Sequence, residues 1–510
     1  MNREHAGSGS APARVARGSS AVLNAALLAV WLGIVVFTTT RHEYWRDEVR
    51  VLSLARTAAS PLDLVHVIRY EAHPVLWYLV IYLGDSILHS PLVLPIASIV
   101  TAFAAMAVFM FRAPFPWWLR TLFLFSAFPL YEYSVKVRNY GISMLFLFLA
   151  AALYRDRERR WLALAVVLAL LANTNAHSVP LALLLMAVWL WDQRGNRHVL
   201  MAAGIVGLGI VVSLIVVSVP RDTVLSRFYA RTPSEFANAV VQSLLYPRPG
   251  FRTLFPSFIP WAVDQVILYL AIVGLIRRPV LVLAAVGGLM GLGTLFRVGV
   301  PGDYRHAGLF LCYLLTLYWI AADADRRSPA GTRFPRFAQV LGYGALTATI
   351  LAGVYRSRAV PIDISHAVSS SKALGAFLHS NAELREAILV PEPDYYLESL
   401  PYYADNPIYL TREGRFGKNA SWSSANAQQL SLGELMAEAR RLRIRYRRPV
   451  LVVLGHPGPR TGEAGEAAMF YRKRFTWTAA EREELERSFT RVAEFWDAYS
   501  DENYSVYAVK

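Results

Sequence analysis

The chain has a single cysteine, Cys312, among its 510 residues. An intramolecular disulfide is therefore excluded, and any part outside a membrane must be stabilised by its core alone. Charged residues are also scarce at 17%, whereas hydrophobic residues reach 55% and the mean hydropathy is +0.34. These values lie well above those of ordinary soluble proteins. The composition therefore indicates a protein embedded in a membrane.

The sequence has no visible internal repeat. Many transporters are built from repeated halves, so this absence argues against a transporter. Residues 1–20 are rich in Gly, Ser, Ala and Arg, and we expect them to form a disordered cytoplasmic tail. The apolar run that follows, 21–37, ends without a small-residue cleavage pattern. We therefore interpret it as a signal anchor and not as a cleaved signal peptide.

Apolar runs near membrane-spanning length recur through the first two-thirds of the chain. They predict a polytopic α-helical membrane protein with about eleven transmembrane helices, followed by a soluble C-terminal α/β domain. The expected spans lie near 21–39, 91–111, 117–135, 139–154, 160–176, 179–192, 199–219, 257–276, 279–296, 306–322 and 337–355.

One apolar segment, 75–89, could either span the membrane or lie along its interface as an aromatic-rich helix. If it lies flat, most loop arginines fall on the side of the N-terminus, which the positive-inside rule makes cytoplasmic. These arginines occur at 112–120, 155–160, 194–197, 277–278 and 326–336. We therefore prefer an interfacial helix and a cytoplasmic N-terminus. Basic residues at helix ends, in a chain of net charge +15, favour anionic lipid headgroups over nucleic acid as partners.

Residues 356–510 differ in character, being mixed and globular in composition. Segments 386–394 and 448–458 each predict a strand that runs into a Pro/Gly turn, and 432–448 and 479–496 predict amphipathic helices. The sequence thus divides into a tail (1–20), a transmembrane catalytic domain (21–355) with an exoplasmic loop (40–90), and an exoplasmic α/β domain (356–510).

Ionisable residues gather on one face of the membrane in this topology. Such residues are costly at that depth and usually line a polar cavity. The candidates are Asp47 and Glu48 as catalytic carboxylates, with Glu71, His73, Lys136, Arg138, Tyr140, His177, Arg305 and His306 as substrate-binding residues.

A carboxylate among cations at a bilayer surface suits the transfer of a sugar from a lipid phosphate. The acceptor hydroxyl needs one general base, which typically contributes about 10²–10⁴-fold. Phosphate is a good leaving group that arginines stabilise, so no carboxylic acid is required, in contrast to ordinary glycosidases. A single direct displacement inverts the anomeric centre.

The stretches RDE (46–48), EAHPVLWY (71–78) and VRNYG (137–141) resemble, in order and spacing, the GT-C superfamily of lipid-phosphate-sugar glycosyltransferases. The protein O-mannosyltransferase and lipid A aminoarabinose transferase branches are the most similar. The resemblance covers about the first 180 residues by motif and the rest by layout. It implies that Asp47 is the catalytic carboxylate and Glu48 its acidic neighbour.

The resemblance also places His73 where the aminoarabinose branch has a lysine that contacts phosphate. That branch's second-loop aspartate has no counterpart here, because Lys136 and Arg138 occupy the stretch. We assign no metal site and no certain cofactor. Whether the protein uses a divalent cation is left open, because members of the superfamily differ in their use of metal ions. The implied partners are a polyprenyl-phosphate sugar, a protein, lipid or glycan acceptor, and the bilayer of a bacterial-type inner membrane, in cell-envelope glycan biosynthesis.

Simpler interpretations stand beside these. Asp47 and Glu48 could belong to a solvated loop or cap a helix over 47–58, Arg138 could reach lipid headgroups, and His177 could be structural. Two other functions also remain open, namely a transporter or flippase of an anionic lipid-linked substrate and a non-catalytic membrane scaffold.

Overall fold

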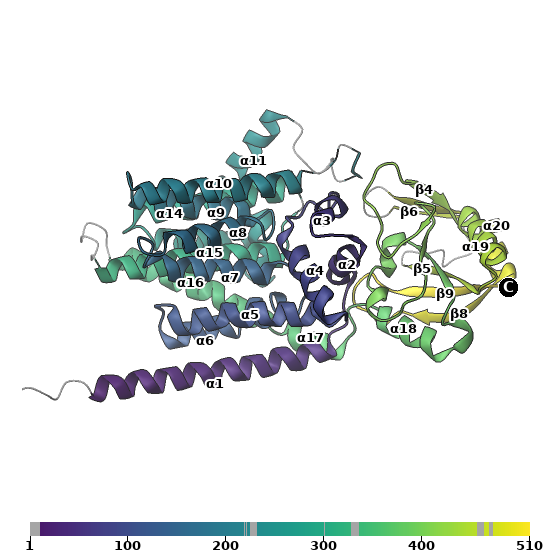
Figure 1. Cartoon of the computed structure of the whole chain (residues 1–510), viewed down its shortest axis with the longest axis horizontal. Coiled ribbons are helices and arrows are strands. Elements are labelled where there is room, and N and C mark those ends of the chain that lie inside the picture. Colours follow the sequence, from purple (N-terminus) through teal and green to yellow (C-terminus); the bar gives the residue numbers. More distant parts are fainter. Residues whose placement is uncertain are drawn as a thin grey trace, which may run out of the picture.

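The computed structural model describes residues 11–218, 220, 222–224, 232–299, 301–327, 336–455, 464–468 and 473–510. These residues form a helix bundle and a C-terminal α/β region (366–510), which meet across a layer of short helices (Figure 1). The layer consists of α2 (Arg46–Thr57), α3 (Asp63–Val67) and α4 (Leu76–Leu88).

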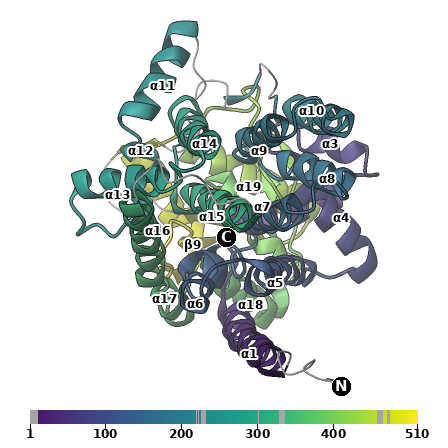
Figure 2. The ribbon, with the colours of Figure 1, turned by 90° about the vertical axis from the view of Figure 1, so that its left-hand side faces the viewer.

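The helices of the bundle are α1 (Ala11–Arg41), α5 (Val93–Arg112), α6 (Trp117–Leu124), η1 (Phe128–Glu132), α7 (Tyr140–Tyr154), α8 (Trp161–Ala172), α9 (Ser178–Asp192), α10 (Arg197–Val217), α11 (Pro233–Leu245), α12 (Arg248–Phe251), η3 (Arg252–Leu254), α13 (Trp261–Val273), α14 (Pro279–Val298), α15 (Tyr304–Arg327), α16 (Arg336–Arg356) and α17 (Ala359–Ser365). Most helices of the bundle run side by side, and Figure 2 shows these end-on, whereas α11 lies at an angle to them.

Six helical segments in the described residues are long and apolar enough to cross a membrane. Each of the eleven predicted spans contains a helix, but those in α7, α8, α9 and α13 are shorter apolar helices of 12 to 15 residues. The span expected at 117–135 is broken into α6 and η1, where Pro129 cannot donate a backbone hydrogen bond. The six long segments are Ala21–Arg41, Val93–Arg112, Arg197–Val217, Pro279–Val298, Tyr304–Arg327 and Phe337–Ser365.

The first helix begins at Ala11, inside the segment for which the sequence predicts disorder. Residues 11–20 continue the helix of the first span, since alanine and arginine are both strong helix formers. Residues 1–10 of the expected tail lie outside the described part of the chain.

The ambiguous segment 75–89 forms α4, both ends of which lie at the end of the bundle that faces the C-terminal region. The Leu76 amide donates to the Asn173 carbonyl (3.3 Å) beside the end of α8. Helix α5, which follows α4, starts at the same end, where the Ser98 hydroxyl donates to the Lys136 carbonyl (3.5 Å). These contacts, and not its length, distinguish α4 from the bundle helices, because α8 and α13 are as short, with 12 and 13 residues. Figure 2 accordingly shows α4 lying across the end of the bundle.

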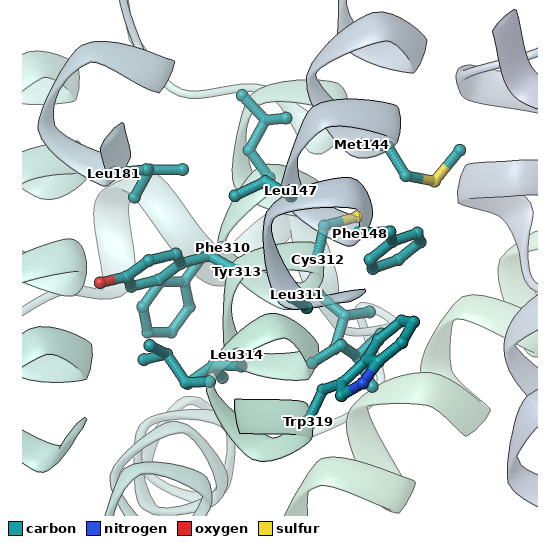
Figure 3. Close-up of a cluster of buried hydrophobic side chains, with 14 of the residues drawn as sticks. Met144, Leu147, Phe148, Leu181, Phe310, Leu311, Cys312, Tyr313, Leu314 and Trp319 are labelled. Atoms are coloured by element: carbon teal, nitrogen blue, oxygen red, sulfur yellow. The ribbon is translucent and has the colours of Figure 1, made fainter. Parts of the chain in front are cut away.

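The core of the bundle is a continuous cluster of apolar side chains around α15 and α7. Tyr313 and Trp319 of α15 are almost completely buried, as is Phe148 of α7. Figure 3 shows them with Cys312, which is also fully buried and free. This packing fixes the ends of α7 and α15 relative to each other, and both helices start at the layer of short helices.

The C-terminal α/β region contains a four-stranded sheet in the order β1-β5-β9-β8. Strands β1 (Ile388–Glu392) and β5 (Val450–Gly455) are parallel, and β9 (Tyr504–Val509) pairs antiparallel with β5 and β8 (Phe489–Phe495). The other strands are β2 (Tyr409–Leu410), β3 (Arg415–Phe416), β4 (Gln429–Ser431), β6 (Gly465–Ala468) and β7 (Arg474–Trp477). Its helices are α18 (Ser371–Ser380), η4 (Ala382–Leu384), η5 (Asp394–Leu397), η6 (Leu400–Tyr402), α19 (Leu432–Tyr446) and α20 (Ala479–Ser488).

Both predicted strands and the helix expected at 432–448 are present as β1, β5 and α19; residues 456–458 of the second predicted strand lie outside the described part of the chain. The helix expected at 479–496 is wrong in its second half. It ends as α20 at Ser488, and the chain continues as β8. A tertiary contact explains the difference, because residues 489–495 pair with β9 and form the edge strand of the sheet.

Candidate active site

A cavity of about 340 Å³ lies where the bundle, the layer of short helices and the C-terminal α/β region meet. Its wall includes the first residues of α2, the loop before α4, and the residues at the starts of α7, α9 and α15. Eight of the ten predicted site residues line this cavity, so the structure brings them together at one end of the bundle. These eight are Asp47, Glu71, His73, Arg138, Tyr140, His177, Arg305 and His306.

Asp47 is the carboxylate of α2 that faces the cavity, with 31% of its side chain exposed. Its Oδ2 lies 3.2 Å from Nη1 of Arg138 and 3.7 Å from Nη2 of Arg305. Burial opposes ionisation, but Arg138 and Arg305 outweigh it and lower the pKa of Asp47 to about 2. Asp47 is therefore a carboxylate at neutral pH, held between two guanidinium groups.

The two arginines come from separate elements that close packing holds together. Arg138 lies in the turn before α7 and also donates to the Asp47 backbone carbonyl (2.7 Å). Arg305 is the second residue of α15. The turn before α7 depends on Gly141, because a Cβ at that position would lie 2.4 Å from the Tyr133 carbonyl oxygen.

A buried polar network holds the ends of α7, α8 and α9 at the cavity. The Asn139 amide donates to the Thr174 carbonyl (3.0 Å), and the Ser143 hydroxyl donates to that of Thr174 (2.7 Å). Asn175 donates to Ser143 (2.7 Å) and accepts from the Ser178 amide (3.0 Å). All five residues are buried, so these bonds form in a low-dielectric setting and fix the geometry of the helix ends.

Three histidines line the cavity beside the arginines. The rings of His177 and His306 lie 4.7 Å apart, and His306 also contacts the ring of Tyr140 at 5.3 Å. Burial and the charge of Arg138 lower the pKa of His73 to about 4. His73 is therefore neutral at pH 7, and the positive charge of the cavity comes from its arginines.

Several buried polar atoms around the cavity have no hydrogen-bond partner among the described residues. They are His73 Nδ1, the Tyr140 hydroxyl, His177 Nδ1 and Arg305 Nε. Buried polar groups are nearly always satisfied in native proteins, so these four atoms are available to water or to a polar ligand in the cavity.

Glu48 and Lys136 do not line the cavity, contrary to the roles expected for them. Glu48 is 3% exposed and is held by His42 Nε2 (3.1 Å) and by the amides of Trp45 (2.9 Å) and Val137 (2.8 Å). The Lys136 ammonium pairs with Glu132 (3.2 Å), one helical turn earlier. Successive residues of a helix or turn point in different directions, which is why neighbours of Asp47 and Arg138 in sequence are not neighbours in the cavity.

The cavity also contains residues that the sequence did not single out. Arg50 lies one turn after Asp47 on α2 and could have been found from that spacing. It donates to both oxygens of Glu71 (2.7 and 2.8 Å) and to Glu398. Trp422, whose ring lies 4.8 Å from the Arg50 guanidinium, belongs to the C-terminal α/β region and carries no sequence signal of a site.

The arrangement can bind an anion through Arg138 and Arg305 while presenting the carboxylate of Asp47 to a neighbouring group. No group of three or more His, Cys, Asp or Glu in the described residues is arranged to hold a metal ion. The chain matches no protein-family model, and a comparison with curated proteins finds no significant similarity.

Proposed function

We propose that the protein is an inverting glycosyltransferase of GT-C type that moves a sugar from a polyprenyl-phosphate donor to an acceptor hydroxyl. The observation that carries this proposal is the Asp47 carboxylate between Arg138 and Arg305 in the wall of a polar cavity. A base and two phosphate-binding cations are what this transfer requires.

In the proposed reaction, Asp47 accepts the proton of the acceptor hydroxyl as its oxygen attacks the anomeric carbon. The bond from that carbon to the phosphate oxygen breaks, and polyprenyl phosphate leaves with the electron pair. Arg138 and Arg305 stabilise the negative charge that develops on the phosphate. The donor phosphate competes with Asp47 for both guanidinium groups, and this competition raises the pKa of Asp47 and makes it a better base.

The proposal includes a topology of eleven crossings with a cytoplasmic N-terminus and an exoplasmic active site. The short helices α7, α8, α9 and α13 complete their crossings with non-helical residues at their ends. Supporting this, α4 stays at one end of the bundle, so the arginine-rich loops fall on the opposite side. The C-terminal α/β region then lies on the exoplasmic side with the cavity.

A flippase of an anionic lipid is the second candidate, since it also needs cations in a cavity. The position of the cavity at one end of the bundle favours the enzyme, because carriers bind their substrates near the middle of the membrane.

Substitution of Asp47 tests the proposal most directly. Purified protein in lipid receives polyprenyl-phosphate sugars with candidate acceptors, and released polyprenyl phosphate is measured. We expect Asp47→Asn to lower the rate by about 10²–10⁴-fold, because the general base is lost while the shape of the side chain is kept. Asp303→Asn is the matched control, since Asp303 lies near Arg305 (4.0 Å) but is 57% exposed and does not line the cavity.

Equal release by wild type and Asp47→Asn would remove Asp47 from the mechanism. Transport of intact donor across the bilayer without any release of polyprenyl phosphate would instead identify a flippase.

A further inference from the structure

A second hollow of about 660 Å³ adjoins the candidate active site, and we call it the basic groove. It lies between α2, α3 and the segment 415–421 of the C-terminal α/β region. Five of its lining residues are basic and one, Glu71, is acidic. The basic residues are Arg50, Arg56, Arg69, Arg415 and Lys418.

Helix α2 forms a continuous floor from the cavity into the basic groove. Asp47 and Arg50 line the cavity, whereas Arg50, Leu54 and Thr57 line the groove. These residues are three or four apart and therefore lie on one face of the helix. Ten residues of helix separate Asp47 from Thr57, a distance of about 15 Å. The groove and Asp47 therefore lie along the same face of α2, with Arg50 between them.

Arg50 and Glu71 line both hollows and mark the boundary between them. Arg50 is fixed on several sides, by Glu71, by Glu398 and by the Ala420 carbonyl (2.9 Å). It is 7% exposed, so its charge is already matched within the protein. The cations that remain for a ligand are those nearer the solvent.

Two of these cations are only loosely engaged. Arg69 is exposed and forms no ion pair within 4.0 Å among the described residues, and it donates to the Tyr70 hydroxyl at 3.3 Å. Lys418 is 45% exposed and lies 3.7 Å from Asp405, a side chain that is itself 98% exposed. Such an exposed pair is weak and exchanges readily for a ligand carboxylate or phosphate.

The other two exposed cations have closer partners. Arg56 pairs with Asp85 (2.7 Å) and Arg415 with Glu413 (2.6 Å). A guanidinium carries five N–H donors, so each arginine keeps donors for a further acceptor.

The rest of the lining suits a sugar chain. Hydroxyl and amide groups come from Ser53, Thr57, Asn419 and Ser421, and an aromatic ring comes from Phe416, which is 39% exposed. Hydroxyl and amide groups exchange hydrogen bonds with sugar hydroxyls, and an exposed aromatic face packs against the apolar face of a sugar ring.

We propose that the basic groove binds the acceptor of the reaction, and that this acceptor is a saccharide bearing carboxylate or phosphate groups. This inference rests on the proposed function, which requires an acceptor hydroxyl at Asp47. It assigns the C-terminal α/β region a role in acceptor selection, because residues 415–421 supply one wall of the groove.

The test measures binding of defined probes to the full-length protein in phosphatidylcholine nanodiscs at low ionic strength. The probes are a labelled hexamer of galacturonic acid, neutral maltohexaose, a phosphorylated maltohexaose and hexaglutamate. We expect both anionic saccharides to bind more tightly than the neutral one. The double variant Arg69→Gln/Lys418→Gln should weaken their binding by about tenfold, since each charge-assisted contact contributes to affinity.

The matched control is Lys372→Gln/Arg448→Gln. These two cations are 52% and 49% exposed and lie 3.6 and 3.5 Å from glutamates outside the groove. The control removes the same charge and should leave binding unchanged.

Equal binding by wild type and the groove variant would overturn the inference, as would equal affinity for the neutral and anionic saccharides or tighter binding of hexaglutamate. Because binding needs no donor and no turnover, it is separate from the test of the enzyme. Absence of sugar transfer would contradict the proposed function but not the role of the basic groove. Sugar transfer together with unchanged saccharide binding by the groove variant would contradict the role of the groove alone.

Discussion

The two adjacent carboxylates of α2 serve two different regions of the molecule. Asp47 faces the cavity, where its partners Arg138 and Arg305 lie 3.2 and 3.7 Å away and solvent has access. Glu48 points into what we call the junction network, which comprises His42, Glu48, Tyr131 and Asp363. One region holds its charges open to a ligand, and the other has closed around them.

The junction network is closed because every charge in it has a partner. His42 lies between Glu48 (3.1 Å) and Asp363 (2.8 Å), and Asp363 also accepts from the Tyr131 hydroxyl (2.8 Å). The network joins the end of α1, the start of α2, η1 and α17. Orphaned polar atoms occur around the cavity, whereas His42, Glu48, Tyr131 and Asp363 have none. Ion pairs occur in both regions, and the unsatisfied polar atoms beside the cavity distinguish it from the junction network.

Among the substitutions that test the difference between the two regions, Glu48→Gln should have the largest effect. It leaves a buried charge on His42 with one partner fewer, so we expect a loss of about 3–5 kcal/mol in the free energy of unfolding. Chemical denaturation in detergent measures this loss. Glu43→Gln is the control, because Glu43 pairs loosely with Lys372 (3.6 Å), and it should cost less than about 1 kcal/mol.

If Glu48→Gln instead kept its stability and lost activity, the roles of the two carboxylates would have to be exchanged.

The pH dependence of stability tests the same network. Burial lowers the pKa of His42, but Glu48 and Asp363 outweigh it and raise the pKa to about 10. The protonated state is thus favoured by folding; the stability it contributes is complete below the unfolded value of about 6.5 and is lost as pH rises toward 10. We expect a decline of about 1.4 kcal/mol per pH unit between about pH 7 and pH 9.

His42→Gln should remove this slope, and denaturation of both proteins across the pH range measures the difference. Parallel curves for the two proteins would show that His42 is neutral in the folded state.

The comparison also explains how much the sequence could predict. Asp47, Arg138, His177 and Arg305 all stand at ends of apolar runs, so their gathering at one end of the bundle could be predicted from the alternating direction of successive helices. Which of Asp47 and Glu48 faces the cavity could not be predicted in this way, because that depends on which side of α2 meets His42 and the Val137 amide.

Contacts between residues far apart in the sequence could not be predicted from the sequence either. Trp422 reaches Arg50 through the fold of the C-terminal α/β region, and no local pattern marks it. The strand at 489–495 exists because β9 is available to pair with it, although its sequence continues a helical pattern. Helix α4 lies at the end of the bundle that faces the C-terminal α/β region, and its position along a membrane interface stays a prediction.

A medium-sized effect is expected for Arg138→Gln. In the proposed reaction this change removes a charge-assisted contact to the donor phosphate, which is worth about 1.5–3 kcal/mol and raises the KM for the donor by about 10- to 150-fold. Steady-state measurements of donor consumption provide the KM. The control is Arg46→Gln, because Arg46 pairs with Asp501 (2.7 Å) outside the cavity and should affect stability but not KM. A KM that is unchanged in Arg138→Gln would place the phosphate elsewhere.

The smallest effect is expected for Lys136→Gln, and this variant tests whether the site extends beyond Arg138. Lys136 is two residues from Arg138, and both are predicted to bind substrate. The Lys136 ammonium, however, contacts Glu132 (3.2 Å) and lies 5.1 Å from the ring of Tyr131. A partly exposed pair of this kind contributes about 0–1 kcal/mol. Donor turnover and unfolding should therefore both stay within about 1 kcal/mol of wild type. A loss of turnover as large as that of Arg138→Gln would mean that the cavity extends to Lys136 when the donor is bound, and that the two positive side chains act on the phosphate together.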